Sequence, residues 1–171
     1  MIAMKLTLIL SLIFAAGLAD AADTTVTLTG VHNCCKGCTN GITKAATSVK
    51  DVTVTAEGST VKVTAKSKAN ANKAVEALNA AGYFGTSDAE ESGITSAATK
   101  PAKKLTEATV SGAHLCCGKC VKAMTDAVKS VAGVTETNIV SKESTFTVKG
   151  NFTEGDLLAA MKKAGFTGEV K

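Results

Sequence analysis

One short pattern occurs twice in the 171-residue chain, and this repeat limits the folds that the chain can adopt. Each copy reads small residue, Gly, apolar residue, His, any residue, then Cys-Cys-x-x-Cys, first at Thr29–Cys38 and again at Ser111–Cys120. The similarity extends to Ala81–Tyr83 and Ala164–Phe166, near the ends of the two copies. The repeat therefore predicts two small domains of one kind in tandem, each with its own core.

The apolar residues of each copy follow the same succession of strand and helix periods. In the first copy, residues 26–28 alternate as in a half-buried strand, and residues 42–49 place apolar side chains on one helical face. Residues 52–54 and 61–63 alternate again around a turn at Glu57 and Gly58, which predicts a hairpin. A second helical stripe covers residues 71–78, Gly82 ends that helix, and Tyr83 begins a short last strand. The order predicts the α+β class, with two ferredoxin-like βαββαβ sandwich domains.

The residues outside the two copies have the composition of a leader and a linker. Lys5, the apolar run Leu6–Leu18 and the small residues Ala19–Ala21 predict a signal peptide at residues 1–21. The apolar run is shorter than the roughly 20 residues of a membrane-spanning helix. Residues 91–104 are small and polar and contain the chain's single proline, Pro101, which predicts a linker between domains at residues 22–90 and 105–171. We expect a secreted or periplasmic mature protein that does not span a membrane.

The composition argues against two classes of function. The formal net charge is +4, and all of the positive charge comes from lysines spread along the chain, because there is no arginine. A nucleic-acid-binding protein usually concentrates basic residues and uses arginine forks, so we expect no nucleic-acid partner. The sequence contains no Gly-x-Ser-x-Gly motif and no phosphate-binding loop, and we expect that the protein is not an enzyme.

All cysteines and histidines of the chain lie in the two repeated loops. These candidate metal ligands are Cys34, Cys35, Cys38, His32, Cys116, Cys117, Cys120 and His114. Each loop precedes a predicted helix, whose N-terminus favours the thiolate form that binds metal. Two sulfurs suit near-linear coordination, three suit trigonal Cu(I), and three sulfurs with a histidine suit tetrahedral zinc. Each histidine either adds a nitrogen ligand, caps the loop or faces solvent.

Two other uses of these cysteines stay open. Exported cysteines often form disulfides, although three thiols in a loop cannot all pair within it. A Cys-x-x-Cys pair at a helix start also suits thiol–disulfide exchange. The predicted order of elements is not that of thioredoxin, and we expect no cis-proline beside the site, because Pro101 is the only proline.

The loops, the apolar residues Ile42 and Met124 four positions after each last cysteine, and the Ala-Gly-aromatic motifs resemble the heavy-metal-associated domain family. That family includes copper chaperones, domains of metal-pumping ATPases and the periplasmic mercury-binding protein. The resemblance implies a βαββαβ fold with a solvent-facing metal loop. It places the two family ligands of each domain on Cys35 and Cys38, and on Cys117 and Cys120. The loops here are two residues longer than is usual in the family, carry an extra cysteine, and have histidine where methionine is usual.

These observations predict an exported carrier, buffer or scavenger of a soft metal ion, Cu(I), Zn(II) or Hg(II), with about one ion per domain. Two sites on a linker can deliver metal to a membrane metal transporter, or can trap one ion between the loops. The alternative hypothesis is a thiol–disulfide redox protein that uses the Cys-x-x-Cys pairs.

Overall fold

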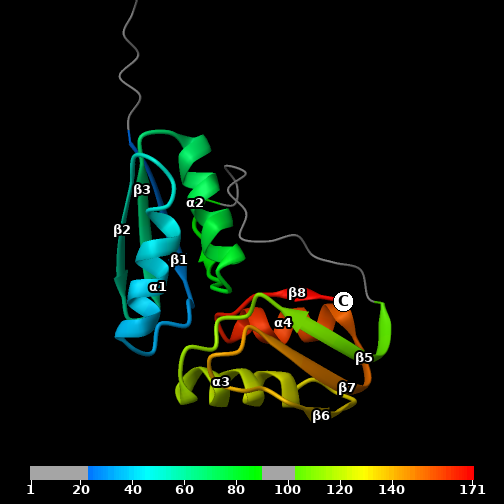
Figure 1. The fold of residues 1–171 in the computed structure, drawn as a ribbon. Coiled ribbons are helices and arrows are strands. Elements are labelled where there is room, and N and C mark those ends of the chain that lie inside the picture. Colours follow the sequence, from blue (N-terminus) through cyan, green and yellow to red (C-terminus); the bar gives the residue numbers. More distant parts are fainter. Residues whose placement is uncertain (1–22, 90–102) are drawn as a thin grey trace, which may run out of the picture.

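The computed structural model describes residues 23–89 and 103–171, here called the first and second halves. The predicted signal peptide and most of the predicted linker lie outside the described residues. The first half contains β1 (Thr24–Thr29), α1 (Lys36–Ala46), β2 (Val52–Glu57), β3 (Thr60–Ala65), α2 (Lys68–Ala80) and β4 (Thr86–Ser87). The second half contains β5 (Lys104–Ser111), α3 (Gly118–Lys129), β6 (Val134–Thr137), β7 (Thr145–Thr153), α4 (Glu154–Lys163) and β8 (Glu169–Val170) (Figure 1).

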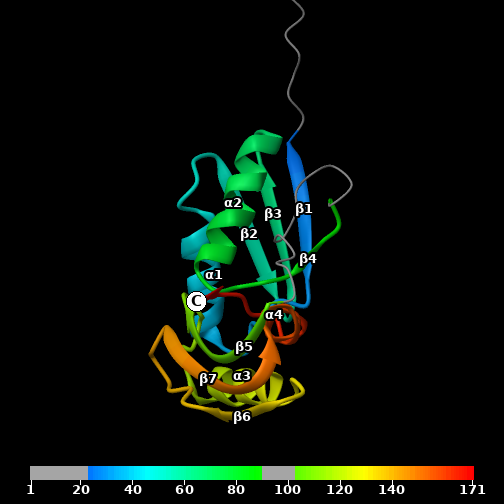
Figure 2. The ribbon, with the colours of Figure 1, turned by 90° about the vertical axis from the view of Figure 1, so that its right-hand side faces the viewer.

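Each half has an antiparallel four-stranded sheet, in the order β2-β3-β1-β4 and β6-β7-β5-β8. The predicted α+β class is confirmed, and both halves show the succession of the split βαβ arrangement. In β1 and β3 the inward residues Val26 and Val63 are opposite each other and fully buried, while their neighbours along each strand are exposed or half-buried. The helices α1 and α2 therefore cover one face of the sheet (Figure 2). No helix among the described residues is long and apolar enough to cross a membrane.

The predicted helical stripes form the cores of both halves. On α2, the stripe at residues 71–78 is buried, and on α1 Ile42 and Ala46 have no exposed surface. Leu157 and Met161 on α4 and Met124 on α3 occupy the matching places in the second half. Burying such side chains is worth about 1.5–3 kcal/mol each, so helix-on-sheet packing stabilises each half.

Three details differ from the sequence-based expectations. Tyr83 does not begin the last strand of its own sheet, because it pairs instead with Phe166 of the other half, and β4 starts only at Thr86. The turn at Gly58 is as short as predicted, but residues 138–144 form a longer connection in the second half. Strand β5 begins at Lys104, the last residue of the predicted linker.

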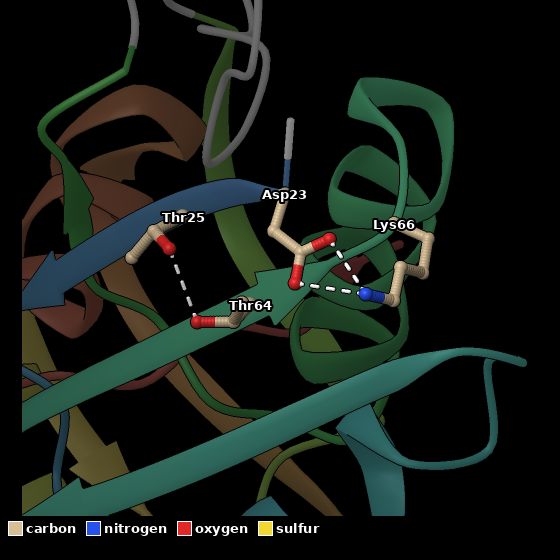
Figure 3. A network of polar contacts seen from close by, with 4 residues as sticks. All are labelled: Asp23, Thr25, Thr64 and Lys66. Atoms are coloured by element: carbon tan, nitrogen blue, oxygen red, sulfur yellow. Dashed lines mark hydrogen bonds and ion pairs between the residues drawn. The ribbon is translucent and has the colours of Figure 1, made fainter. Parts of the chain in front are cut away.

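The open end of the first sheet is held by polar contacts on the surface. Lys66 forms an ion pair with Asp23 at 3.0 Å, and the hydroxyls of Thr25 and Thr64 are 3.1 Å apart across β1 and β3 (Figure 3). Both members of the ion pair are largely exposed, so it contributes at most about 1 kcal/mol. These contacts tie the beginning of β1 to the end of β3, far from the cysteine loops.

The two halves contact each other through the turns that follow α2 and α4. The amide of Thr167 donates to the carbonyl of Gly82 at 3.1 Å, and the amide of Phe84 donates to that of Gly165 at 3.1 Å. The amide of His32 also donates to Gly165, at 3.3 Å. Both glycines have positive φ, +85° and +81°, as is usual after a helix. A Cβ at Gly82 would collide with the backbone at residues 112–114, and one at Gly165 with the backbone at residues 30–32. Close docking of the halves therefore requires glycine at both positions.

We predict that Gly82→Ala weakens the contact between the halves, because its methyl group would enter the backbone of the other half. The expected loss of stability is about 1–3 kcal/mol from overpacking, in addition to the cost of the backbone conformation. Hydrogen exchange should show faster exchange of the Thr167 amide. The matched control is Gly30→Ala, since Gly30 has a φ of +80° but open space around its Cβ position. Equal exchange rates for Thr167 in the two variants would contradict this account of docking.

Candidate metal centre

Each cysteine loop ends in the first turn of a helix. Cys35 is the N-cap residue of α1 and Cys117 is the N-cap residue of α3, and neither cysteine side chain makes a capping hydrogen bond. The free N–H groups of a first turn attract negative charge. Cys38 and Cys120 lie one turn further on and are fully buried. The predicted placement of the thiols at helix starts is therefore found in both halves.

The six sulfurs lie together in one cluster that both halves build. Within the loops, Sγ–Sγ distances are 3.8 Å for Cys34–Cys38 and Cys35–Cys38, 3.6 Å for Cys116–Cys120, and 3.8 Å for Cys117–Cys120. Across the halves they are 3.9 Å for Cys34–Cys117, 3.8 Å for Cys34–Cys120, Cys35–Cys116 and Cys38–Cys120, and 3.5 Å for Cys38–Cys116. All six thiols are free, because a disulfide needs about 2.05 Å. The loops thus face each other, and not only solvent as the family resemblance implies.

The cluster contains two electrostatically different kinds of thiol. Backbone N–H groups, chiefly that of Cys120, lower the pKa of Cys117 to about 6, and the N–H of Cys38 chiefly lowers the pKa of Cys35. Burial, with neighbouring thiols, raises the pKa of Cys34, Cys116 and Cys120. Cys35 and Cys117 therefore ionise more readily than a free thiol, whereas Cys34, Cys116 and Cys120 keep their protons until a cation replaces them.

The two histidines flank the cluster in different surroundings. The hydroxyl of Tyr83 donates to the carbonyl of Cys38 at 3.2 Å and lies 2.9 Å from Nε2 of His114. A hydroxyl has one proton, so when it is donated to Cys38, Nε2 of His114 must carry the hydrogen of the second bond, which leaves Nδ1 as the unprotonated nitrogen. His32 stacks on Phe166 at 4.2 Å, and its Nε2 is buried with no hydrogen-bond partner. Burial lowers the pKa of both histidines, which favours the neutral form that binds metal.

The helices α1 and α3 differ at the position three residues after the last cysteine of each loop. A Cβ at Gly41 would collide with the hydroxyl of Tyr83, so α1 has glycine where this ring packs. The residue at the same place after the last cysteine of the second loop is Ala123. The residue of that half that corresponds to Tyr83 is Phe166, which has no hydroxyl. The methyl group and the hydroxyl thus exclude each other, and only the first half has a tyrosine.

The structure brings all eight predicted residues to one place. Four groups of ligand atoms lie within 4.8 Å of one another: Cys38, His114, Cys116 and Cys120; His32, Cys34 and Cys120; Cys34, Cys35 and Cys38; and Cys35, Cys116 and Cys117. Three of the groups draw on both halves. The contacts of Tyr83 and Phe166 with the histidines of the opposite half were not predicted from the sequence. The paired change of Gly41 and Tyr83 to Ala123 and Phe166 could have indicated that Tyr83 packs on α1 of its own half, but not its contact with the opposite half.

Comparison with known proteins supports the metal-binding interpretation in the second half. Residues 109–167 match the family model of the heavy-metal-associated domain. The first half is not part of that match, so a tandem of two such domains stays a prediction. Among curated proteins, no sequence matches the chain significantly. The solution structure of the N-terminal soluble domains of Bacillus subtilis CopA is similar over 88% of this chain and 95% of that chain, with 19% identity and a TM-score of 0.32. We base no conclusion on that likeness.

We predict that Gly41→Ala destabilises the protein by about 1–3 kcal/mol, because its methyl group would displace the Tyr83 hydroxyl. In a Tyr83→Phe background the penalty should fall below about 1 kcal/mol, since alanine is also the better helix former. Urea unfolding of the two single variants and the double variant measures this coupling. The second half already has the combination of the double variant, because Ala123 and Phe166 stand where the first half has Gly41 and Tyr83. The same penalty in both backgrounds would show that the hydroxyl is not the cause.

Proposed function

We propose that this protein binds soft metal ions at a centre shared by its two halves, and that it acts as an extracytoplasmic carrier, buffer or scavenger of these ions. The observation that carries the proposal is the set of five sulfur–sulfur contacts of 3.5–3.9 Å between the loops. Soft thiolates select Cu(I), Zn(II) and heavier soft cations. The match of residues 109–167 to the heavy-metal-associated domain supports heavy-metal binding independently of this geometry.

The geometry favours a shared centre over one ion in each loop. Cys38 and Cys120 are buried and in contact with each other, so an ion held by either would also be close to a sulfur of the other half. An ion bound there would stabilise the docked halves, because it binds that arrangement and not the separated one. The trapping of an ion between the loops is thus the better of the two arrangements that the sequence left open. A binding role without catalysis belongs to the same proposal.

Export and delivery are the parts of the proposal that rest on the sequence alone. The predicted signal peptide ends at Ala21, so the mature chain should begin at Ala22. A membrane metal transporter is the proposed recipient, which would take the ion by ligand exchange. N-terminal sequencing of the protein from the medium or periplasm should find Ala22, and recovery of the uncut chain from the cytoplasm would contradict export.

The low pKa of Cys117 supports a second candidate function, thiol–disulfide exchange. A readily ionised thiol beside a second thiol, here Cys120 at 3.8 Å, is the arrangement that attacks disulfides. Metal binding and thiol–disulfide exchange would use the same sulfurs, so an activity measurement is needed to distinguish them. A redox protein turns over a disulfide substrate with glutathione in the absence of metal, whereas a carrier does not.

We predict that a triple serine variant of the second loop (Cys116→Ser, Cys117→Ser, Cys120→Ser) loses most of the metal affinity of the whole chain. A shared centre loses ligands for every ion, whereas separate sites would leave the first loop with one ion at unchanged affinity. The measurement is a competition titration of the reduced, oxygen-free mature protein with Cu(I), Zn(II) and Hg(II) in turn. We expect at least a hundredfold loss for the preferred metal.

The matched control is the triple serine variant of the first loop, Cys34→Ser, Cys35→Ser and Cys38→Ser, which should lose affinity to the same extent. If each triple variant keeps one ion at the affinity of the native protein, the centre is not shared. If the native protein retains none of the three metals, the carrier proposal fails and disulfide exchange becomes the better hypothesis.

A further inference from the structure

We propose that the six cysteines hold one polynuclear copper(I)–thiolate cluster with places for four ions, a deeper statement of the metal-binding function proposed above, on which it rests. The arrangement of the sulfurs suggests this number. The nine close Sγ–Sγ contacts outline four triangles that share edges, and each triangle offers three sulfurs to one ion.

The triangles form a strip that runs from one loop to the other. Its members are Cys35–Cys38–Cys116, Cys38–Cys116–Cys120, Cys34–Cys38–Cys120 and Cys34–Cys117–Cys120. The edge between Cys38 and Cys120 lies in the middle, and exchange of the two halves maps the strip onto itself. Every triangle contains sulfurs of both halves. The cluster therefore exists only while the halves are docked.

The size of the triangles suits a metal ion at the centre of each. The Cys34–Cys38–Cys120 triangle has three edges of 3.8 Å. The centre of such a triangle is about 2.2 Å from each corner, which is close to the length of a zinc–thiolate bond, about 2.3 Å. An ion can thus take three sulfurs there without displacement of the loops. Three-sulfur coordination in a plane suits Cu(I), whereas zinc prefers four ligands in a tetrahedron.

The ligand groups available to zinc are fewer. Among the described residues, one group of four has all its ligand atoms within 4.8 Å, and it comprises Cys38, His114, Cys116 and Cys120. Zinc at that place would leave Cys34, Cys35 and Cys117 without a metal. Four monovalent ions on six thiolates leave a net charge of −2, so filling all four triangles uses every sulfur and neutralises most of the charge of thiolates that lie this close together.

The decisive experiment is an anaerobic Cu(I) titration of the reduced mature protein, followed by native mass spectrometry and copper X-ray absorption. We expect a four-copper form as the last specific species, three sulfurs around each copper, and copper–copper scattering. Saturation at one or two ions without copper–copper scattering would overturn the cluster and leave the proposed metal-binding function intact. Retention of no copper, zinc or mercury would overturn both.

Matched serine variants test the assignment of triangles. Cys35 belongs to one triangle and Cys38 to three, so Cys35→Ser should retain three copper ions and Cys38→Ser one. Because a serine at position 38 would bury a hydroxyl, Cys38→Ala is measured as well. Circular dichroism of each variant establishes that the protein is folded. Equal copper numbers for Cys35→Ser and the folded Cys38 variants would overturn this arrangement.

Discussion

The docking of the two halves through the turns after α2 and α4 is the contact on which the metal centre depends. Each turn places a left-handed glycine against the backbone of the opposite half, where a side chain of any size would collide. The aromatic residue that follows each glycine then packs its ring against the histidine of the opposite loop, with centroids 4.2 Å apart in both cases. The Ala-Gly-aromatic motif therefore ends a helix, joins the halves and aligns the loops at the same time.

The sequence predicted what depends on periodicity and local chemistry. The helical stripe at residues 71–78 and the short turn at Gly58 follow from side-chain spacing, and both are found where expected. The thiols at the starts of α1 and α3 follow from the position of the loops between strand and helix. The sheet register of a small α+β unit leaves few alternatives once the apolar faces are fixed.

The relation between the loops could not be predicted in the same way, because it depends on how two separately folded units dock. Spacing within a loop limits which sulfurs share an ion locally, yet contains nothing about the opposite loop. One feature of the sequence did point across the halves. Three thiols in one loop cannot all pair within it, so each loop has a thiol left over. In the structure Cys38 contacts Cys116 and Cys120 of the opposite loop, which joins the six sulfurs into one cluster.

In the proposed copper–thiolate cluster, the two ends and the middle differ in how readily a metal ion could enter and leave. Cys35 and Cys117 are its least buried thiols and have lowered pKa values, so an ion from solvent meets thiolates there first. Cys38 and Cys120 in the middle are fully buried and each contacts several other sulfurs. An ion can therefore pass inward by exchange of one sulfur for the next, without a step in which it has no thiolate ligand. The same path in reverse would bring the ion to Cys35 or Cys117, where a thiol of the proposed recipient could reach it.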